Sequence, residues 1–198
     1  MARVNKSLAL ITLVLIVCAG PWAGQARAAG NPGDAGLLFL RLGIGAREAA
    51  MGDAGVATSQ GAAAVFWNPA NNVFADFETE LILQHHRWLG LFDQEGAALA
   101  HRLGNGGVLG FIFSGLYADE LTRYGVDGVG VPEGSFSPYD VAFGLSYAHP
   151  LGESFGVGLT AKVVYERIDV YSDTGFAFDF AVTHQAMIEG LMFAATAT

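Results

Sequence analysis

The stretch Tyr139–His149 reads YDVAFGLSYAH, and two kinds of side chain alternate along it. The odd-numbered positions carry large side chains that are mostly apolar, whereas the even-numbered positions carry small or polar ones. This period of two predicts a β-strand with two different faces. The apolar face of a soluble sandwich packs on an inner core and its other face is solvated. Here the second face is made of Ala, Gly and Ser with one Asp, which is typical of the interior of a membrane β-barrel.

The same alternation continues through residues 79–198 in segments of about ten residues, the length of a tilted membrane strand. Strands are predicted at Glu80–Trp88, Gly96–Leu103, Gly107–Tyr117, Tyr139–His149, Phe155–Arg167, Phe176–Thr183 and Ile188–Thr196. The predicted fold class is therefore all-β, a transmembrane antiparallel outer-membrane β-barrel. Because bacterial barrels have even strand numbers, we expect these seven strands to be the first part of a longer barrel whose C-terminal remainder is missing.

The connections between the predicted strands alternate in length, as periplasmic turns and extracellular loops do in such barrels. Short connections are predicted at Gly104–Gly107, Pro150–Ser154 and Gln185–Met187, and long ones at Leu89–Glu95, Ala118–Pro138 and Ile168–Gly175. This assignment places aromatic residues at both membrane boundaries. The outer girdle would hold Trp88, Tyr117, Tyr139 and Tyr165, and the periplasmic girdle would hold Tyr147 and Phe155.

Residues 1–28 have the features of a secretory signal peptide: Arg3 and Lys6, an apolar core, and the small-x-small pattern Ala26-Arg27-Ala28. Its removal takes away three of the 10 Lys and Arg residues and leaves all 19 Asp and Glu residues, a formal charge of −12. An acidic exported protein is a poor nucleic-acid binder. Cys18 is lost with the peptide, so disulfides and Cys-ligated metals are excluded as well. The expected location is the outer membrane of a diderm bacterium, in contact with its lipid.

No pattern for catalysis, cofactor or metal binding is present. The run Gly43-Ile-Gly45 lacks the third glycine and the βαβ unit of a dinucleotide site. No serine stands in a GxSxG elbow. His85 and His86 are neighbours on a strand and point to opposite faces, so they cannot share a metal ion. We therefore expect no enzyme, no cofactor and no metal.

Residues 29–78 precede the first predicted strand and are rich in Gly and Ala. Three motifs occur there in order, LGxGAR over Leu42–Arg47, MGxAxVA over Met51–Ala57 and AxxWNPA over Ala64–Ala70. Together they resemble the PorV/PorQ outer-membrane proteins, which belong to the FadL-like barrels. The resemblance implies a barrel of about 14 strands in which this segment folds back as a plug. The implied plug residues are Gly45, Arg47, Met51, Gly52, Trp67, Asn68, Pro69 and Ala70.

The residues themselves agree with a plug, because glycines allow close backbone approach and Asn-Pro makes a stiff turn. The alternative is that Trp67–Ala70 only turns the chain into the first strand. The sequence also departs from the family: Asn71-Asn72 stands where relatives usually have Gly-Leu, and Thr58–Gly61 where relatives often have acidic residues.

For function, the resemblance implies a role in type IX secretion, with secreted cargo proteins and a translocon as partners. The alternative is a FadL-like channel for long-chain fatty acids or other hydrophobic compounds. Four charged residues are predicted on the lumen face, Asp140, Lys162, Glu166 and Asp179. They would either anchor the plug and line a path, or simply be hydrated and paired across strands.

Overall fold

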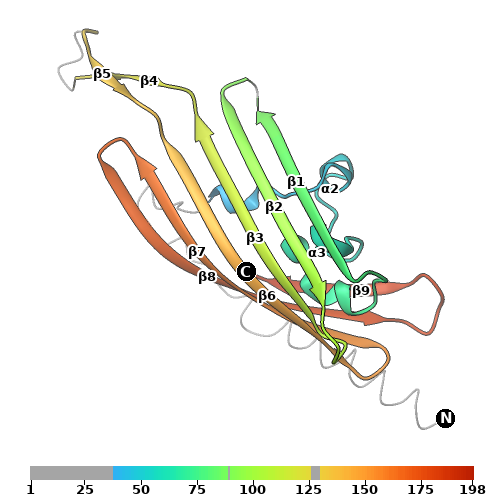
Figure 1. The fold of residues 1–198 in the computed structure, drawn as a ribbon. Helices are drawn as coiled ribbons and strands as arrows, with labels where there is room; N and C mark the ends of the chain where they lie inside the picture. Colours follow the sequence, from blue (N-terminus) through green and yellow to red (C-terminus); the bar gives the residue numbers. More distant parts are fainter. Residues whose placement is uncertain (1–37, 89, 126–129) are drawn as a thin grey trace, which may run out of the picture. The chain divides into compact units, whose positions relative to one another are not determined.

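Seven strands form one antiparallel sheet in the computed structural model, which describes residues 38–88, 90–125 and 130–198 (Figure 1). The strands are β1 (Thr79–Trp88), β2 (Phe92–Arg102), β3 (Val108–Ala118), β6 (Tyr139–Leu151), β7 (Phe155–Ile168), β8 (Tyr171–Gln185) and β9 (Met192–Ala197). They follow one another in the sheet in chain order. The predicted antiparallel all-β fold is thus confirmed. The predicted signal peptide and residues 29–37 lie outside the described residues.

A separate two-stranded sheet, β4 (Leu121–Tyr124) and β5 (Pro132–Phe136), lies within the long connection between β3 and β6. This hairpin projects beyond the large sheet (Figure 1). An ion pair between Arg123 and Asp169 ties it to the turn between β7 and β8. We call this end of the sheet the hairpin end. The opposite end, with the turns after β2, β6 and β8, is the turn end.

The long connections predicted at Leu89–Glu95 and Ile168–Gly175 are wrong. β2 begins at Phe92 and β8 begins at Tyr171, so both connections are tight turns. The strands continue here through polar outward positions such as Asp93, where the alternation of apolar residues has already stopped. A backbone ladder needs no apolar side chain, and it therefore runs further than the hydrophobic pattern that predicted it.

The two faces of the sheet have opposite burial. On β6, the outward Leu145 is 62% exposed and the neighbouring Ser146 is 3% exposed. The same holds on β8, where Phe176, Phe178 and Phe180 are exposed and alternate with half-buried or buried residues. The large apolar side chains thus form the exposed outer face, and the small and polar ones form the covered inner face. This is the arrangement that the alternation predicted.

Trp88 is an exception to the predicted outer girdle. It lies at the hairpin end, but its position in β1 is on the inner face, opposite Phe92. Its ring stacks on His86 at 4.7 Å, and its Nε1 donates to Gln94 Oε1 at 3.5 Å. A tryptophan with an inward partner for its N–H satisfies that donor without a membrane interface. Tyr117, Tyr139 and Tyr165 do lie on the outer face.

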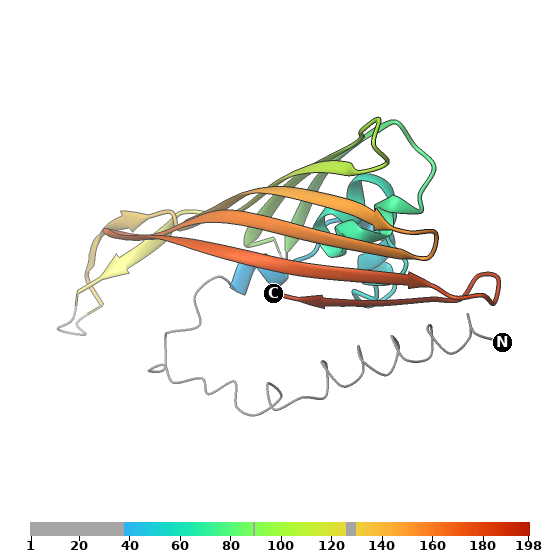
Figure 2. The same ribbon diagram turned by 90° about the horizontal axis from the view of Figure 1, so that it is seen from below.

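The inner face is covered by an inner segment, residues 38–78, which precedes β1. Its elements are η2 (Leu38–Arg41), α2 (Ala46–Ala50), α3 (Gly61–Trp67) and η3 (Pro69–Val73). In Figure 2 these helices lie inside the curl of the sheet. Ala62 and Val65 of α3 pack with Ala98 and Ile112 in the main buried cluster. Within the described ranges, no helix is long and apolar enough to cross a membrane.

Candidate functional site

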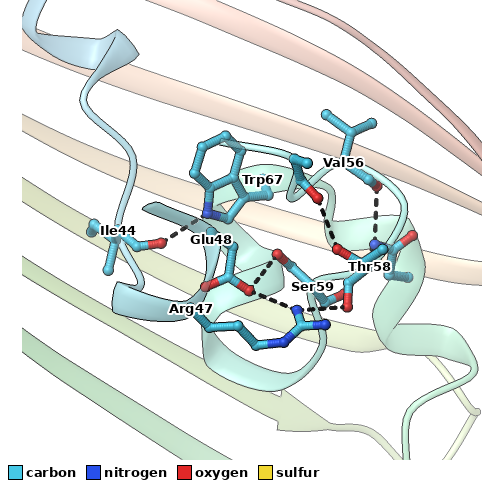
Figure 3. Close-up of polar contacts among 9 residues, drawn as sticks. Ile44, Arg47, Glu48, Val56, Thr58, Ser59 and Trp67 are labelled. Atoms are coloured by element: carbon cyan, nitrogen blue, oxygen red, sulfur yellow. Dashed lines mark hydrogen bonds and ion pairs between the residues drawn. The ribbon is translucent and has the colours of Figure 1, made fainter. Parts of the chain in front are cut away.

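Trp67 is the centre of the inner segment. Its Nε1 donates to Ile44 O at 2.8 Å (Figure 3). Its ring lies on the backbone of Gly43 and Gly55, where an added Cβ would come within 2.1 and 2.6 Å of ring atoms. Gly43 and Gly55 therefore have to be glycines, because the indole ring fills the space that their side chains would need. This contact brings the LGxGAR, MGxAxVA and WNPA motifs together.

Glu48 joins α2 to the loop that leads into α3. Its carboxylate is buried, and Oε1 accepts from Ser59 Oγ at 2.8 Å and from Arg47 Nη1 at 3.3 Å (Figure 3). The Arg47 guanidinium also donates to Thr58 O at 3.3 Å while most of its side chain stays exposed. A buried carboxylate needs such partners, because an unpaired charge in the interior is costly. Arg47 was predicted from the motif, whereas Glu48 and Ser59 were not.

Gly45, Met51 and Gly52 shape the ends of α2. Gly45 has φ +116°, and a side chain there would collide with the Glu48 carboxylate. Met51 N donates to the carbonyl oxygens of Arg47 and Glu48, and the Met51 side chain is exposed. Gly52 has φ +68° with no atom near its missing side chain, so its role is the left-handed turn alone.

Asn68, Pro69 and Ala70 are buried and begin η3. Asn68 Oδ1 accepts from Ala70 N at 3.0 Å, which caps this short helix. Asn68 Nδ2 donates to Val56 O at 2.9 Å and to Thr183 Oγ1 on β8 at 3.0 Å. The WNPA motif is therefore attached to a strand that lies 115 residues further along the chain.

Asn71 and Asn72 extend the same buried network. In the sequence they stood out only as a departure from the PorV/PorQ pattern. Thr183 Oγ1 donates to Asn71 Oδ1 at 2.6 Å, and Asn71 Nδ2 donates to Val56 O and Ser59 O at 3.1 and 3.0 Å. Asn72 Nδ2 donates to Gly61 O at 2.9 Å. Their amides thus supply hydrogen bonds to three backbone carbonyls of the inner segment, one of which, Val56 O, also accepts from Asn68. In the sequence, two consecutive asparagines between apolar residues could have indicated that their side chains are buried and hydrogen-bonded.

Two glutamines on the inner face hold the first half of the inner segment. Gln84 Oε1 on β1 accepts from Gly45 N at 2.7 Å. Gln94 Nε2 on β2 donates to Leu42 O at 2.8 Å. Both bonds bind the LGxGAR backbone directly to the sheet, and Gln94 is 1% exposed. Neither glutamine was predicted as a site residue.

Two charged residues hold the second half. Glu80 Oε1 on β1 accepts from Ala62 N at 3.1 Å, near the start of α3. The guanidinium of Arg102 on β2 donates to Asn72 O at 2.8 Å and to Phe77 O at 3.1 Å. Arg102 thus binds the chain where it leaves η3 and turns towards β1. Hydrogen bonds to charged groups are stronger than neutral ones, so these three bonds add to the attachment.

Glycines on the inner face let the segment approach the sheet. A Cβ added at Gly96 would lie 2.8 Å from Ile44, and one added at Gly158 would lie 2.8 Å from Pro69 Cγ. At Gly156 the nearest atom would be Ala70 O at 2.6 Å. These three inner-face glycines are thus places where the inner segment lies directly on β2 and β7.

The predicted lumen residues form two groups. Lys162 and Asp179 make an ion pair at 2.5 Å, with both side chains 10% exposed, and Lys162 Nζ lies 6.0 Å from the Phe66 ring centre. Asp140 lies opposite Glu166 in the register of β6 and β7, nearer the hairpin end. The first pair is a cross-strand ion pair beneath the inner segment. The structure does not bring the four residues into one cluster.

A cavity of about 400 Å³ lies between the inner segment and the sheet. Its lining combines apolar and charged side chains, among them Leu40, Phe66, Trp67, Lys162 and Asp179. Among the described residues, no three His, Asp or Glu side chains are arranged to hold a metal ion. Compared with known proteins, the chain matches no family model and no curated protein.

Proposed function

We propose that this protein is an outer-membrane β-barrel protein whose outer sheet face contacts lipid. The observation that carries the proposal is the burial pattern, in which the large apolar side chains are exposed and the small and polar ones are covered. An exposed apolar surface of this extent, running across all the large strands, is unusual for a soluble monomer. In a bilayer the same surface is in its preferred solvent.

The dimensions of the apolar surface support this placement. On β6 the outward positions Tyr139 and His149 are ten residue steps apart, and the exposed Leu151 continues the apolar face beyond His149. Ten steps at ~3.3 Å span about 33 Å along the strand. A strand tilted by about 40° would then cover a layer of about 25 Å, the height of the apolar band in outer-membrane barrels.

The inner segment would act as a fixed plug in such a barrel. Gln84, Gln94, Glu80, Arg102 and Thr183 hold it from the sheet, and most of these bonds are to its backbone. β1 and β9 each have one neighbour in the described sheet, and in lipid a free edge leaves unsatisfied backbone groups. We therefore propose that further strands close a barrel of about 14, as the resemblance to PorV/PorQ implies.

Within this class we favour a role in type IX secretion, as a PorV/PorQ-like protein that receives cargo proteins from a translocon. The support is that all three resemblance motifs build one packed unit around Trp67 and Asn68. Deletion of the gene tests the role in a strain that attaches proteins with a shared C-terminal domain to its surface. We expect those cargo proteins to be lost from the surface and to accumulate in the periplasm. Unchanged surface attachment would exclude the secretion role.

The alternative is a FadL-like channel for hydrophobic compounds. The cavity beside Phe66 and Trp67 favours it, together with a second pocket of about 290 Å³ at the hairpin end, lined by residues such as Leu116, Leu121 and Ile168. Mass spectrometry of the purified protein would detect a co-purified fatty acid under this alternative. Uptake of a labelled fatty acid would also fall in the deletion strain, with surface attachment unchanged.

A further inference from the structure

We propose that His101, His149 and His184 form a histidine belt that hydrogen-bonds phospholipid headgroups at the turn end of the sheet. The proposal rests on the proposed membrane placement. Each of the three lies within two residues of the end of a strand that runs towards the turn end, on β2, β6 and β8 respectively. Each occupies an outer-face position, in register with outer-face residues of the neighbouring strands.

The three histidines lie on one level if the strands are tilted as in a barrel. His101 is in the same cross-strand row as Tyr147 and Phe180. His149 lies two residues beyond Tyr147, and His184 lies four residues beyond Phe180. Because β6 is two strand-to-strand steps from β2, and β8 is two such steps from β6, the shift is one residue per step. A shift of ~3.3 Å across strands ~4.8 Å apart corresponds to a tilt of about 35°, the value expected for barrels.

Each ring is fixed through the same nitrogen. Nδ1 has a partner within the protein in all three cases, namely Thr79 Oγ1 at 2.8 Å for His101, Tyr147 OH at 3.2 Å for His149 and Ser154 O at 3.1 Å for His184. Among the described residues, Nε2 of none of the three has a hydrogen-bond partner. Three rings held at Nδ1 on an outer face thus present Nε2 to the surroundings.

Tyr147 lies between Asn105 and His149. Asn105 Nδ2 donates to Tyr147 OH at 3.4 Å, and the Tyr147 hydroxyl has a proton that it can donate to His149 Nδ1 at 3.2 Å. With Nδ1 as acceptor, the proton of a neutral ring is on Nε2, which can donate to a phosphate oxygen. His184 donates from Nδ1 to Ser154 O. Its Nε2 accepts from a headgroup ammonium when the ring is neutral, and donates to phosphate when the ring is charged.

Stacking holds two of the rings in place. The His184 ring lies 4.1 Å from the Phe155 ring at an angle of 19°, and the His149 ring lies 6.0 Å from the Tyr147 ring at 20°. A ring that is already ordered loses little entropy when it binds a headgroup. Tyr147 and Val182 are the next outer-face residues towards the hairpin end, and Leu151 and Phe155 are apolar outer-face residues at the turn end itself.

The other two histidines differ and serve as internal references. His85 is at the hairpin end, with Nδ1 2.8 Å from Glu95 Oε1 and Nε2 4.0 Å from Asp93 Oδ1. His86 is on the inner face, stacked on Trp88. Neither presents a free nitrogen to lipid at the turn end.

Solid-state NMR can measure the contact directly. The protein is labelled with ¹⁵N-histidine and placed in nanodiscs of phosphatidylethanolamine and phosphatidylglycerol in phosphate-free buffer. Dipolar dephasing by ³¹P should attenuate the Nε2 signals of the three belt histidines and leave the His86 signals intact. The variants His101→Gln, His149→Gln and His184→Gln assign the signals, each by the loss of one attenuated resonance.

Two further measurements distinguish a failure of the histidine belt from a failure of the proposed membrane placement. Inorganic phosphate added to the protein in phosphate-free detergent should give no attenuation, and attenuation there would overturn the lipid assignment. Belt signals that stay intact in protein that floats with lipid would overturn the belt but not the proposed membrane placement. Failure of the protein to float with lipid would overturn both.

Discussion

At the scale of single residues, Thr183 joins the two halves of the buried network. Its hydroxyl accepts from Asn68 Nδ2 and donates to Asn71 Oδ1, so one oxygen uses both of its hydrogen-bonding modes. All three side chains are at most 1% exposed. Loss of that hydroxyl would leave a buried donor and a buried acceptor without this partner, which costs more than the bond itself contributes.

The substitution Thr183→Val tests this network, because valine has the same shape and no hydroxyl. We expect the free energy of unfolding to fall by about 1–3 kcal/mol. The measurement is denaturant unfolding in detergent, followed by tryptophan fluorescence. The control is Thr174→Val on the same strand, where the side chain is exposed, with an expected change within about 0.5 kcal/mol. Equal stability of the two variants would contradict the role of Thr183.

At the scale of elements, η3 is packed on β7 without space for side chains between them. Gly156 and Gly158 are the positions of β7 where Ala70 and Pro69 lie on the strand. The neighbours on the η3 side include backbone atoms, which cannot move aside as a flexible side chain can. Close packing of this kind makes the contact sensitive to a single methyl group.

We expect Gly158→Ala to destabilise the protein by about 1–3 kcal/mol, since the new Cβ would lie 2.8 Å from Pro69 Cγ and 3.0 Å from Ala70 N. Thermal unfolding of the detergent-solubilised protein measures the effect. Gly104→Ala is the matched control, because no atom lies within 4 Å of its added Cβ. If both alanine variants unfold at the same temperature, η3 is not held tightly against β7.

At the scale of the whole molecule, the sheet has its apolar side chains on the outside and its own N-terminal segment on the inside. Burial of apolar surface normally drives folding in water. Here the outer apolar face is left exposed, and the covered face is polar and rich in small residues. Tyrosines lie on this face at the hairpin end, and the three histidines of the proposed belt lie on it at the turn end.

The substitution Leu145→Arg tests whether the outer face contacts lipid. Leu145 lies near the middle of the apolar band on β6, so we expect a cost of insertion of about 2–4 kcal/mol. The readout is the fraction of protein that folds into lipid vesicles and floats with them. Ser172→Arg lies on the same face beyond the band and should insert normally. Unchanged flotation of Leu145→Arg would argue against the membrane placement.

The strands and the assignment of their faces could be predicted because they depend on local alternation. Tyr139–His149 and six further segments carry that period of two in consecutive residues, and all seven appear as neighbours in the sheet. The lengths of the two turns at the hairpin end, after Trp88 and after Ile168, could not be predicted, because the ladder continues there through polar positions. The inward face of Trp88 follows from the same period of two, which places it on the face of His86, and its contacts with His86 and Gln94 occupy that side.

The candidate site divides in the same way. By itself the sequence determined the motif residues of the inner segment, the alternation of the strands and the charged residues of the inner face. Only the tertiary structure decided which residues hold the segment, because Thr183 and Asn71 are 112 positions apart and Gln94 and Leu42 are 52 apart. A pattern of neighbouring residues cannot predict pairs that are so far apart in the sequence. They form only when the sheet brings the polar side chains of its inner face against the inner segment, whose buried polar groups need hydrogen-bond partners.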